Sequence, residues 1–204
     1  MTIPVVLFDA DGVIQRTAGG WRERFASMLD DATDLDAFVA EIFASERPCL
    51  TGALDFPTQL GEVLRRWNSR TTVEQALTVW TNIEVDQRVV DLIRALRRSG
   101  VTCCLASNQQ THRAGYMSGE LGYRSLFDRE FYSCRIGHAK PDAAYFERIL
   151  EELRLEPSQA LFIDDVEPNV LSARQVGIPS VHFPANAGVD ALSGHLAAHG
   201  IRLG

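Results

Sequence analysis

Apolar and polar residues follow two different patterns along the chain, and the change between them divides it into two parts. Residues 3–8 (IPVVLF) form a short apolar run rich in β-branched residues, which predicts a buried strand. Residues 16–85 instead place apolar residues at helical spacing and give no sign of a strand. We predict helices in this stretch at residues 21–31, 35–46, 56–69 and 72–83.

From residue 86 onward, strand and helix patterns alternate. Amphipathic segments predict helices at residues 86–100, 111–122, 141–155, 167–177 and 188–200. Apolar runs predict strands at residues 101–107, 129–133, 159–164 and 179–183. This alternation predicts an α/β fold in which a parallel sheet lies between two helical layers, with right-handed crossovers.

The length of 204 residues suits one large domain, or a core domain that carries an insert. We therefore expect a core built from residues 1–15 and 86–204. The helical stretch 16–85 would be inserted after the first strand.

Composition and charge argue against several classes of protein. The net charge is −7, with 27 acidic against 20 basic residues, whereas nucleic-acid-binding proteins display basic surfaces. No apolar run approaches the ~20 residues that span a membrane, and the N-terminus lacks the basic region of a signal peptide. The 4 cysteines show neither metal-binding nor disulfide spacing. We expect a cytoplasmic protein with reduced thiols and with no membrane or nucleic-acid partner.

Polar side chains follow four of the predicted strands. Because the carboxyl ends of parallel strands meet at one edge of a sheet, these side chains should converge on a single site. Its carboxylates would repel one another, so a compensating cation is expected. Mg²⁺ fits best, because it prefers oxygen ligands and bridges to substrate phosphate. The converging residues are Asp9 and Asp11 after the first strand, Ser107 and Asn108 after the second, Lys140 after the third, and Asp164 and Asp165 after the fourth.

Two carboxylates separated by one residue also suit phosphoryl transfer. One can attack phosphorus and form an aspartyl phosphate, which divides a difficult displacement into two easier steps. The other, brought back by a turn at Gly12, can donate a proton to the leaving oxygen and then activate water. Lys140 can supply positive charge to the phosphoryl oxygens and restrain the nucleophile. Ser107 can donate a hydrogen bond to the same oxygens.

Four short segments carry these residues: FDADGVI at 8–14, LASN at 105–108, HAKPD at 138–142 and FIDDVEPNV at 162–170. Their content and order resemble the motifs of the haloacid dehalogenase (HAD) superfamily, and the resemblance extends over nearly the whole chain. It implies a Rossmann-like three-layer α/β/α core with the strand order 3-2-1-4-5. It also implies a small all-α cap of the C1 type where residues 16–85 lie.

The resemblance implies a role for each motif residue. Asp9 would be the nucleophile and Asp11 the general acid/base. Ser107 would bind the transferring phosphoryl group with Asn108 beside it, and Lys140 would lie at the same site. The metal ligands would be Asp9, the backbone carbonyl of Asp11, and Asp165, with Asp164 close by.

One position departs from the common family pattern. Many members carry a second aspartate four residues after the metal-binding one, where this chain has Asn169. We expect Asn169 to hydrogen-bond a metal-bound water and the metal site to be retained. The DDxxxN pattern also resembles the phosphatase domain of soluble epoxide hydrolase and related sugar-phosphate phosphatases. Asp11 favours phosphate over halide chemistry, because the dehalogenases do not need an acid at this position.

The preferred prediction is a Mg²⁺-dependent phosphatase that hydrolyses a small phosphorylated metabolite. A sugar phosphomutase on the same scaffold and a non-catalytic binding or regulatory protein are the alternatives. Arg16, which follows the first motif, is a candidate for binding a distal anionic group of the substrate. Trp21, Trp67 and Trp80 are expected to pack within the helical stretch.

Overall fold

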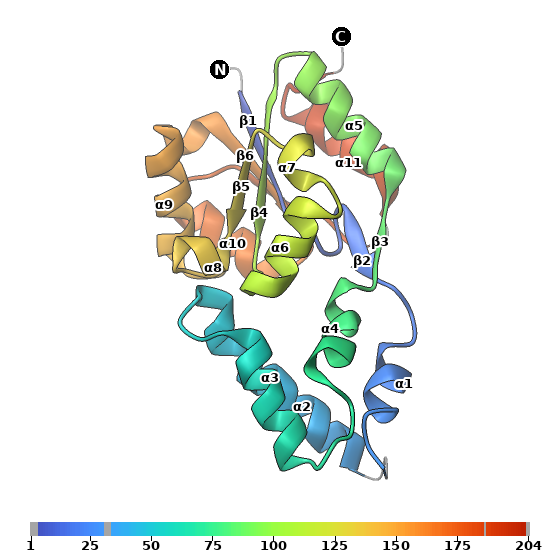
Figure 1. The fold of residues 1–204 in the computed structure, drawn as a ribbon. Coiled ribbons are helices and arrows are strands. Elements are labelled where there is room, and N and C mark those ends of the chain that lie inside the picture. Colours follow the sequence, from blue (N-terminus) through green and yellow to red (C-terminus); the bar gives the residue numbers. More distant parts are fainter. Residues whose placement is uncertain (1–3, 31–33, 186, 203–204) are drawn as a thin grey trace.

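Five parallel strands form a sheet at the centre of the protein in the computed structural model (Figure 1). The strand order is β5-β4-β1-β6-β7, which is the predicted order 3-2-1-4-5 when the strands of this sheet are counted along the chain. Each neighbouring pair is parallel. The strands are β1 (Val5–Phe8), β4 (Thr102–Ser107), β5 (Arg129–Tyr132), β6 (Ala160–Asp164) and β7 (Ser180–His182).

The structure describes residues 4–30, 34–185 and 187–202. Some predicted positions lie outside these ranges: Ile3 of the first predicted strand, Asp31 of the first predicted helix, and the outermost residues of the predicted core (1–3 and 203–204). Within the described ranges, no helix has the length and apolar character needed to cross a bilayer.

Both faces of the sheet are covered by helices, as the alternating pattern predicts. Val6 and Phe8 of β1 point into one apolar cluster, and Val5 and Leu7 point into another on the opposite face. The first cluster is completed by α5 (Gln87–Arg98), α6 (Thr111–Gly119), α7 (Tyr123–Leu126) and α11 (Gly188–Ala198). The second is completed by α9 (Ala143–Leu153) and α10 (Glu167–Gln175).

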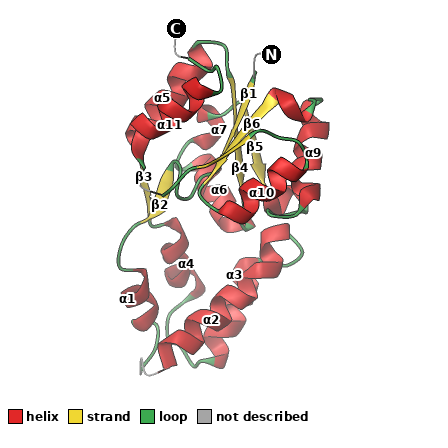
Figure 2. Ribbon diagram, turned by 180° about the vertical axis from the view of Figure 1, so that it is seen from behind, coloured by secondary structure: helices red, strands yellow, loops and turns green. Residues whose placement is uncertain are grey.

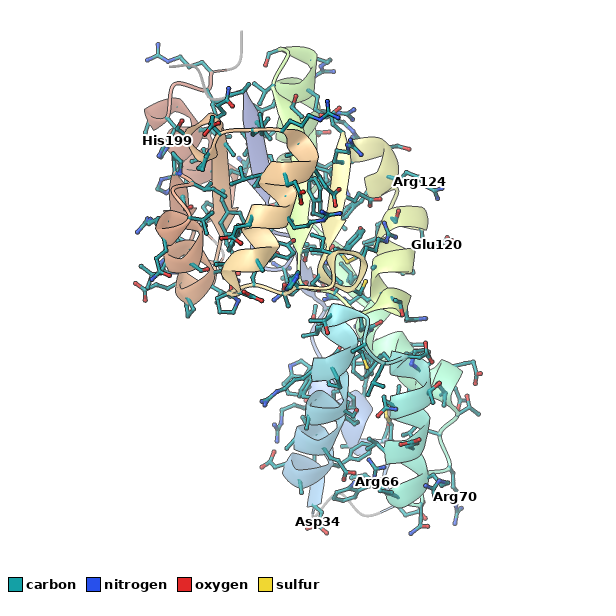
Figure 3. The ribbon with its side chains drawn as sticks, turned by 90° about the vertical axis from the view of Figure 1, so that its left-hand side faces the viewer. Asp34, Arg66, Arg70, Glu120, Arg124 and His199 are labelled. Carbon is teal, nitrogen blue, oxygen red and sulfur yellow. The ribbon has the colours of Figure 1, made fainter. Side chains whose placement is uncertain are left out.

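The helices of the N-terminal half lie beyond the carboxyl ends of the strands (Figure 2). They are α1 (Trp21–Ala26), α2 (Leu35–Glu46), α3 (Phe56–Arg66) and α4 (Val73–Thr81), with the 3₁₀ turn η2 (Arg47–Thr51). We call them the helical segment. It has an apolar core of its own, which includes Phe25, Phe38 and Trp80. Charged side chains such as Asp34, Arg66 and Arg70 stand at its end remote from the sheet (Figure 3).

The limits of these helices follow from local sequence. Asp55 accepts a hydrogen bond from the Thr58 amide at the start of α3, and Thr72 with Gln75 forms a capping box on α4. Asn68 has a φ of 51°, in the left-handed region, so α3 ends before the predicted residue 69. Helix α1 ends at Ala26, earlier than predicted.

The prediction that residues 16–85 contain no strand is wrong. Strands β2 (Gln15–Thr17) and β3 (Ile83–Val85) form a small antiparallel sheet where the helical segment joins the rest of the chain. Each strand has 3 residues, and only Gln15 of β2 is buried. Such short strands carry too few residues for an alternating pattern, and each is paired with a partner far away in the sequence.

Short elements complete the fold. The helices α7 and α8 (Ser133–Ile136) have 4 residues each. Neither is predicted, and α8 begins at Ser133, the last residue of the predicted strand 129–133. The 3₁₀ turn η3 (Pro157–Gln159) leads into β6. Helix α8 contacts η2, so it forms one of the places where the helical segment meets the sheet-containing part.

Candidate active site

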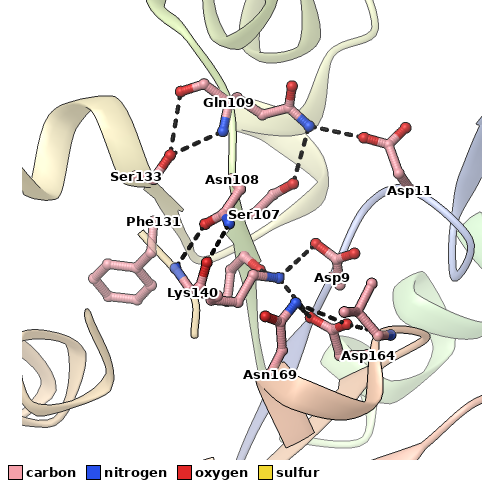
Figure 4. Close-up of polar contacts among 12 residues, drawn as sticks. Asp9, Asp11, Ser107, Asn108, Gln109, Phe131, Ser133, Lys140, Asp164 and Asn169 are labelled. Carbon is pink, nitrogen blue, oxygen red and sulfur yellow. Dashed lines mark hydrogen bonds and ion pairs between the residues drawn. The ribbon is translucent and has the colours of Figure 1, made fainter. Parts of the chain in front are cut away.

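The predicted polar residues converge at the carboxyl edge of the sheet (Figure 4). Asp9 directly follows β1, Ser107 ends β4, and Asp164 ends β6. Lys140 reaches the same place from the loop between α8 and α9. Parallel strands bring these groups together although they are far apart in the sequence.

Lys140 lies at the centre of this group. Its Nζ donates to Asp9 Oδ1 at 2.8 Å, to Asp164 Oδ2 at 2.6 Å, and to the Ala106 carbonyl at 2.8 Å. Burial alone would lower the pKa of this ammonium, but the two carboxylates raise it above its ordinary value. Lys140 is therefore charged, and it compensates two buried carboxylates at once.

Asn108 holds the loop that carries Lys140. Its Nδ2 donates to the Lys140 carbonyl at 2.8 Å, and its Oδ1 accepts from the Lys140 amide at 2.9 Å. Both polar ends of the Asn108 side chain are thus engaged with the backbone of the lysine loop. The structure brings Asn108 to the site as a support for Lys140.

Three carboxylates lie close enough to share a cation. Asp9, Asp164 and Asp165 each offer an oxygen, and these oxygens lie within 4.8 Å of one another. Burial raises the pKa of Asp9, the charges of Asp164 and Asp11 add to the rise, and Lys140 opposes it. Burial and the neighbouring Asp164 likewise raise the pKa of Asp165. A cluster of oxygen donors that resist joint ionisation fits a hard divalent cation such as Mg²⁺.

Gly12 allows Asp165 to reach the cluster. Its φ is +80°, and a Cβ added to it would lie 2.2 Å from Asp165 Oδ2. Any larger residue would therefore displace the Asp165 carboxylate. The turn predicted at Gly12 has a second purpose, since it makes room for a metal-binding candidate that lies far along the chain.

Asp164 is the most enclosed of the three carboxylates. In addition to Lys140, its Oδ1 accepts from the Val166 amide at 2.7 Å, and Asn169 Nδ2 lies 3.1 Å from each of its oxygens. An aspartate at position 169 could not donate this bond. The departure from the common family pattern therefore gives Asp164 an amide donor.

The Asp11 side chain turns away from the carboxylate cluster. Arg113 binds it with two parallel hydrogen bonds, from Nη1 to Oδ2 at 2.7 Å and from Nη2 to Oδ1 at 2.8 Å. Gln109 and Gln15 also donate to it, at 2.9 and 3.1 Å. Burial alone would raise the pKa of Asp11, but Arg113 lowers it below its ordinary value. Asp11 is therefore held as a carboxylate.

Ser107 is linked to Asp11 through Gln109. The side-chain Nε2 of Gln109 lies 3.1 Å from the Ser107 hydroxyl and 2.9 Å from Asp11 Oδ2. The backbone N–H of Gln109 donates to Ser133 Oγ at 2.9 Å. This chain of contacts crosses from the end of β4 to the loop after β1 (Figure 4). It fixes the spacing between the hydroxyl and the second carboxylate.

Gln109, Arg113 and Gln15 are not among the predicted site residues. Gln109 lies just before the predicted helix 111–122 and Arg113 lies in its first turn, so their four-residue spacing gives no sign of a shared helical face. In the structure Arg113 Nη1 does donate to Gln109 Oε1, at 3.1 Å.

Arg16, in contrast, is not brought to the site. It is exposed and pairs with Glu84 across the small β2–β3 sheet, with Nε 2.8 Å from Oε2.

Known proteins resemble this chain in sequence. The sequence profile of the haloacid dehalogenase-like hydrolases matches residues 3–177. The chain is 31% identical over 101 residues to the sesquiterpene phosphatase of Aspergillus oryzae, covering 48% of this chain and 50% of that protein. It is 33% identical over 93 residues to bifunctional epoxide hydrolase 2 of Sus scrofa, covering 42% of this chain and 16% of that protein. It is 26% identical over 171 residues to the D-ribitol-5-phosphate phosphatase of Bacteroides thetaiotaomicron, covering 80% of this chain and 81% of that protein. The chain thus spans half or less of the first two relatives and most of the third.

Solved structures share the fold. A HAD family enzyme of Bacteroides thetaiotaomicron aligns with a TM-score of 0.82 at 18% identity, covering 94% of this chain and 98% of that one. The same enzyme in complex with magnesium and inorganic phosphate aligns with a TM-score of 0.79 at 20% identity, covering 93% and 98%.

Proposed function

Since this hydrolase belongs to the haloacid dehalogenase-like family, we propose that it cleaves a small phosphate monoester through an aspartyl phosphate formed on Asp9, with Mg²⁺ as cofactor. The observation that carries the proposal is the placement of Asp9: it is buried, paired with Lys140, and beside two further carboxylates. Two relatives of the chain are named as phosphatases. The fold neighbour that binds magnesium and inorganic phosphate supports the same chemistry.

Asp9 is suited to act as the nucleophile. Lys140 contacts only its Oδ1 atom, so this contact leaves Oδ2 for attack on phosphorus. In the first step Asp11 is in its protonated form, which it takes up from solvent against the bias of Arg113. A carboxylate oxygen of Asp9 bonds to phosphorus, the bond from phosphorus to the alcohol oxygen breaks, and that oxygen takes the proton from Asp11. In the second step water attacks phosphorus and gives a proton to Asp11, and the bond from phosphorus to Asp9 breaks to release phosphate.

The cation would be held by Asp9, Asp165 and Asp164. When bound, Mg²⁺ would neutralise charge on the phosphoryl oxygens. Lys140 opposes the rise that burial causes in the pKa of Asp9, and its bonds orient Asp9 and Asp164. The Ser107 hydroxyl can donate to a phosphoryl oxygen.

Arg113 is proposed as a positioning residue for Asp11. Its two bonds fix the carboxylate, and its Nε donates to the carbonyl of Trp80 in α4 at 2.9 Å. The ionised form that Arg113 favours is the one that accepts a proton from water in the second step. The contact between Arg113 and Asp11 must loosen when Asp11 takes up a proton.

We further propose that residues 1–15 and 86–204 act as the catalytic core and residues 16–85 as a cap over it. The separate apolar core of the helical segment supports this division. So do its contacts with the catalytic edge, which run from α3 and α4 to α6 and from η2 to α8.

The proposal is tested by replacing the nucleophile. With Mg²⁺ and 4-nitrophenyl phosphate, Asp9→Asn should lower turnover by about 10³-fold or more, because an amide cannot form the acyl phosphate. Mass spectrometry of acid-quenched wild-type enzyme should place a phosphate on Asp9. The matched control is Asp190→Asn, an exposed aspartate that contacts Arg88, and it should retain wild-type turnover. Full turnover in Asp9→Asn would show that another group attacks phosphorus.

A further inference from the structure

A cavity of about 280 Å³ lies between the helical segment and the catalytic edge. Asn108, Gln109 and Arg113 line its catalytic side. Gln109 and Arg113 both contact Asp11, and Asn108 holds Lys140, so the cavity lies next to the residues that support the proposed acid/base and the lysine. The alcohol that leaves phosphorus after it takes a proton from Asp11 would have this space nearby. This volume is enough for a small organic group.

The opposite wall is apolar and largely aromatic. It is formed by Trp21, Phe25, Phe43, Leu50, Val79 and Trp80 of the helical segment. The rings pack edge to face, with centroids 5.9 Å apart for Trp21 and Phe25 and 5.6 Å apart for Phe25 and Trp80. Trp21 and Trp80 therefore pack in the helical segment, as the sequence predicts, and they also face the cavity. Such a wall favours the burial of apolar surface.

The polar side chains on the catalytic side are already engaged. Both ends of the Asn108 amide bind the Lys140 backbone. The Gln109 amide donates to Asp11 and Ser107 and accepts from Arg113. The guanidinium of Arg113 is occupied by Asp11, Gln109 and the Trp80 carbonyl. A leaving group with several hydroxyls would lose its water here and find few partners, and each unpaired hydroxyl is costly.

Glu46 gives the cavity its local charge. It is the one carboxylate among the residues that line the cavity, and it faces the Trp80 and Gln110 side chains. The charge of Arg113 is offset by Asp11, with which it makes two hydrogen bonds. At a pH where Glu46 is ionised, an acidic leaving group would therefore be repelled.

We propose that this cavity receives the alcohol part of the substrate, and that this alcohol is small, uncharged and mainly apolar, in place of a polyol or a hydroxy acid. The inference rests on the proposed phosphatase function. It adds a substrate class, argued from the wall, the engaged amides and the single carboxylate.

The test compares three phosphate esters at pH 8 with Mg²⁺, and 4-nitrophenyl phosphate serves as the reference substrate. The probes are 2-phenylethyl phosphate, D-ribitol 5-phosphate and 2-phosphoglycolate, which present an apolar, a polyhydroxylated and an acidic leaving group. We expect kcat/KM for 2-phenylethyl phosphate to exceed that for each of the other two by at least about tenfold. The first two alcohols are similar in size, so the comparison isolates polarity.

Two variants trace the preference to the cavity. Phe43→Ser removes part of the apolar wall from a side chain that is already 41% exposed, and should lower kcat/KM for 2-phenylethyl phosphate by about tenfold relative to D-ribitol 5-phosphate. Leu54→Ser makes a similar change at a side chain that is 44% exposed and does not line the cavity, and should leave the ratio unchanged. Glu46→Gln should raise the relative kcat/KM for 2-phosphoglycolate.

The outcomes separate the inference from the proposed function. If 4-nitrophenyl phosphate and all three probes are left intact, the phosphatase proposal fails. If 4-nitrophenyl phosphate is hydrolysed but the polyol or the acid is preferred, the substrate class is wrong and the phosphatase proposal stands. A preference for the apolar ester that Phe43→Ser leaves untouched would place the alcohol outside this cavity.

Discussion

Asp11 is held by side chains that lie elsewhere in the sequence. Arg113 comes from α6, Gln109 from the loop after β4, and Gln15 from the start of β2. The guanidinium lowers the pKa of Asp11 and outweighs the effect of partial burial, which would raise it. A group that must both give and accept a proton is thus biased toward its ionised form by one neighbour.

Replacing Arg113 should therefore change the pH dependence of catalysis. In Arg113→Gln the pKa of Asp11 should rise, since the guanidinium that lowers it is lost. The limb of the kcat–pH profile that follows Asp11 should move to higher pH, and kcat should fall about tenfold with a smaller change in KM.

The measurement is kcat across pH 4–9 with 4-nitrophenyl phosphate. Arg113→Lys keeps the charge but loses the paired geometry, so its profile should lie between the other two. A purely structural role for Arg113 would lower kcat by the same factor at every pH, and the profiles of wild type and Arg113→Gln would then superimpose only after each is normalised to its maximum.

The turn after β1 shows how one element prepares a site for another. Gly12 has φ +80°, and the space its missing side chain leaves is filled by the Asp165 carboxylate from the end of β6. The turn is predictable from the sequence but this contact is not, because the two residues meet only once β1 and β6 are paired in the sheet.

Gly12→Ala should weaken the metal site. The added Cβ would lie 2.2 Å from Asp165 Oδ2, so the carboxylate must move, and we expect the concentration of Mg²⁺ for half-saturation to rise at least about tenfold. The left-handed backbone should also cost about 1–2 kcal/mol of folding free energy.

Gly100→Ala is the matched control for this prediction. Gly100 has φ +92°, so it carries the same backbone cost, but a Cβ there meets nothing within 4 Å. Isothermal titration with Mg²⁺ and urea unfolding separate the two effects. Equal Mg²⁺ affinity in both variants would mean that Asp165 does not bind the cation.

Over the whole molecule, the sequence is informative wherever a signal is local. The buried strand before Asp9 and the helix over residues 35–46 are visible as apolar patterns, and the four motifs stand directly after predicted strands. The strand order came from the family resemblance. The β2–β3 sheet and the Asp11–Arg113 pair were missed, because each joins residues distant in sequence with no repeating pattern between them.

Glu46 connects the two parts of the molecule, since it belongs to α2 and lies against the cavity that faces the catalytic edge. Burial raises its pKa from 4.5 to about 7. Between these two values the folded chain binds more protons than the unfolded chain, so the free energy of unfolding falls as pH rises. Glu46→Gln removes this titration. Its advantage over wild type in urea unfolding should be near zero at pH 4.5 and on the order of 2 kcal/mol at pH 8.

The exposed Glu147 provides the control, since Glu147→Gln makes the same change at a side chain that is open to water. A constant difference between Glu46→Gln and wild type from pH 4.5 to 8 would mean that Glu46 is as well hydrated in the folded chain as in the unfolded one. The expected result instead assigns a folding cost to this carboxylate at pH 8, where it is ionised and faces the cavity. Because Glu46 destabilises the fold at this pH, we infer that its role is to control which leaving groups enter the cavity.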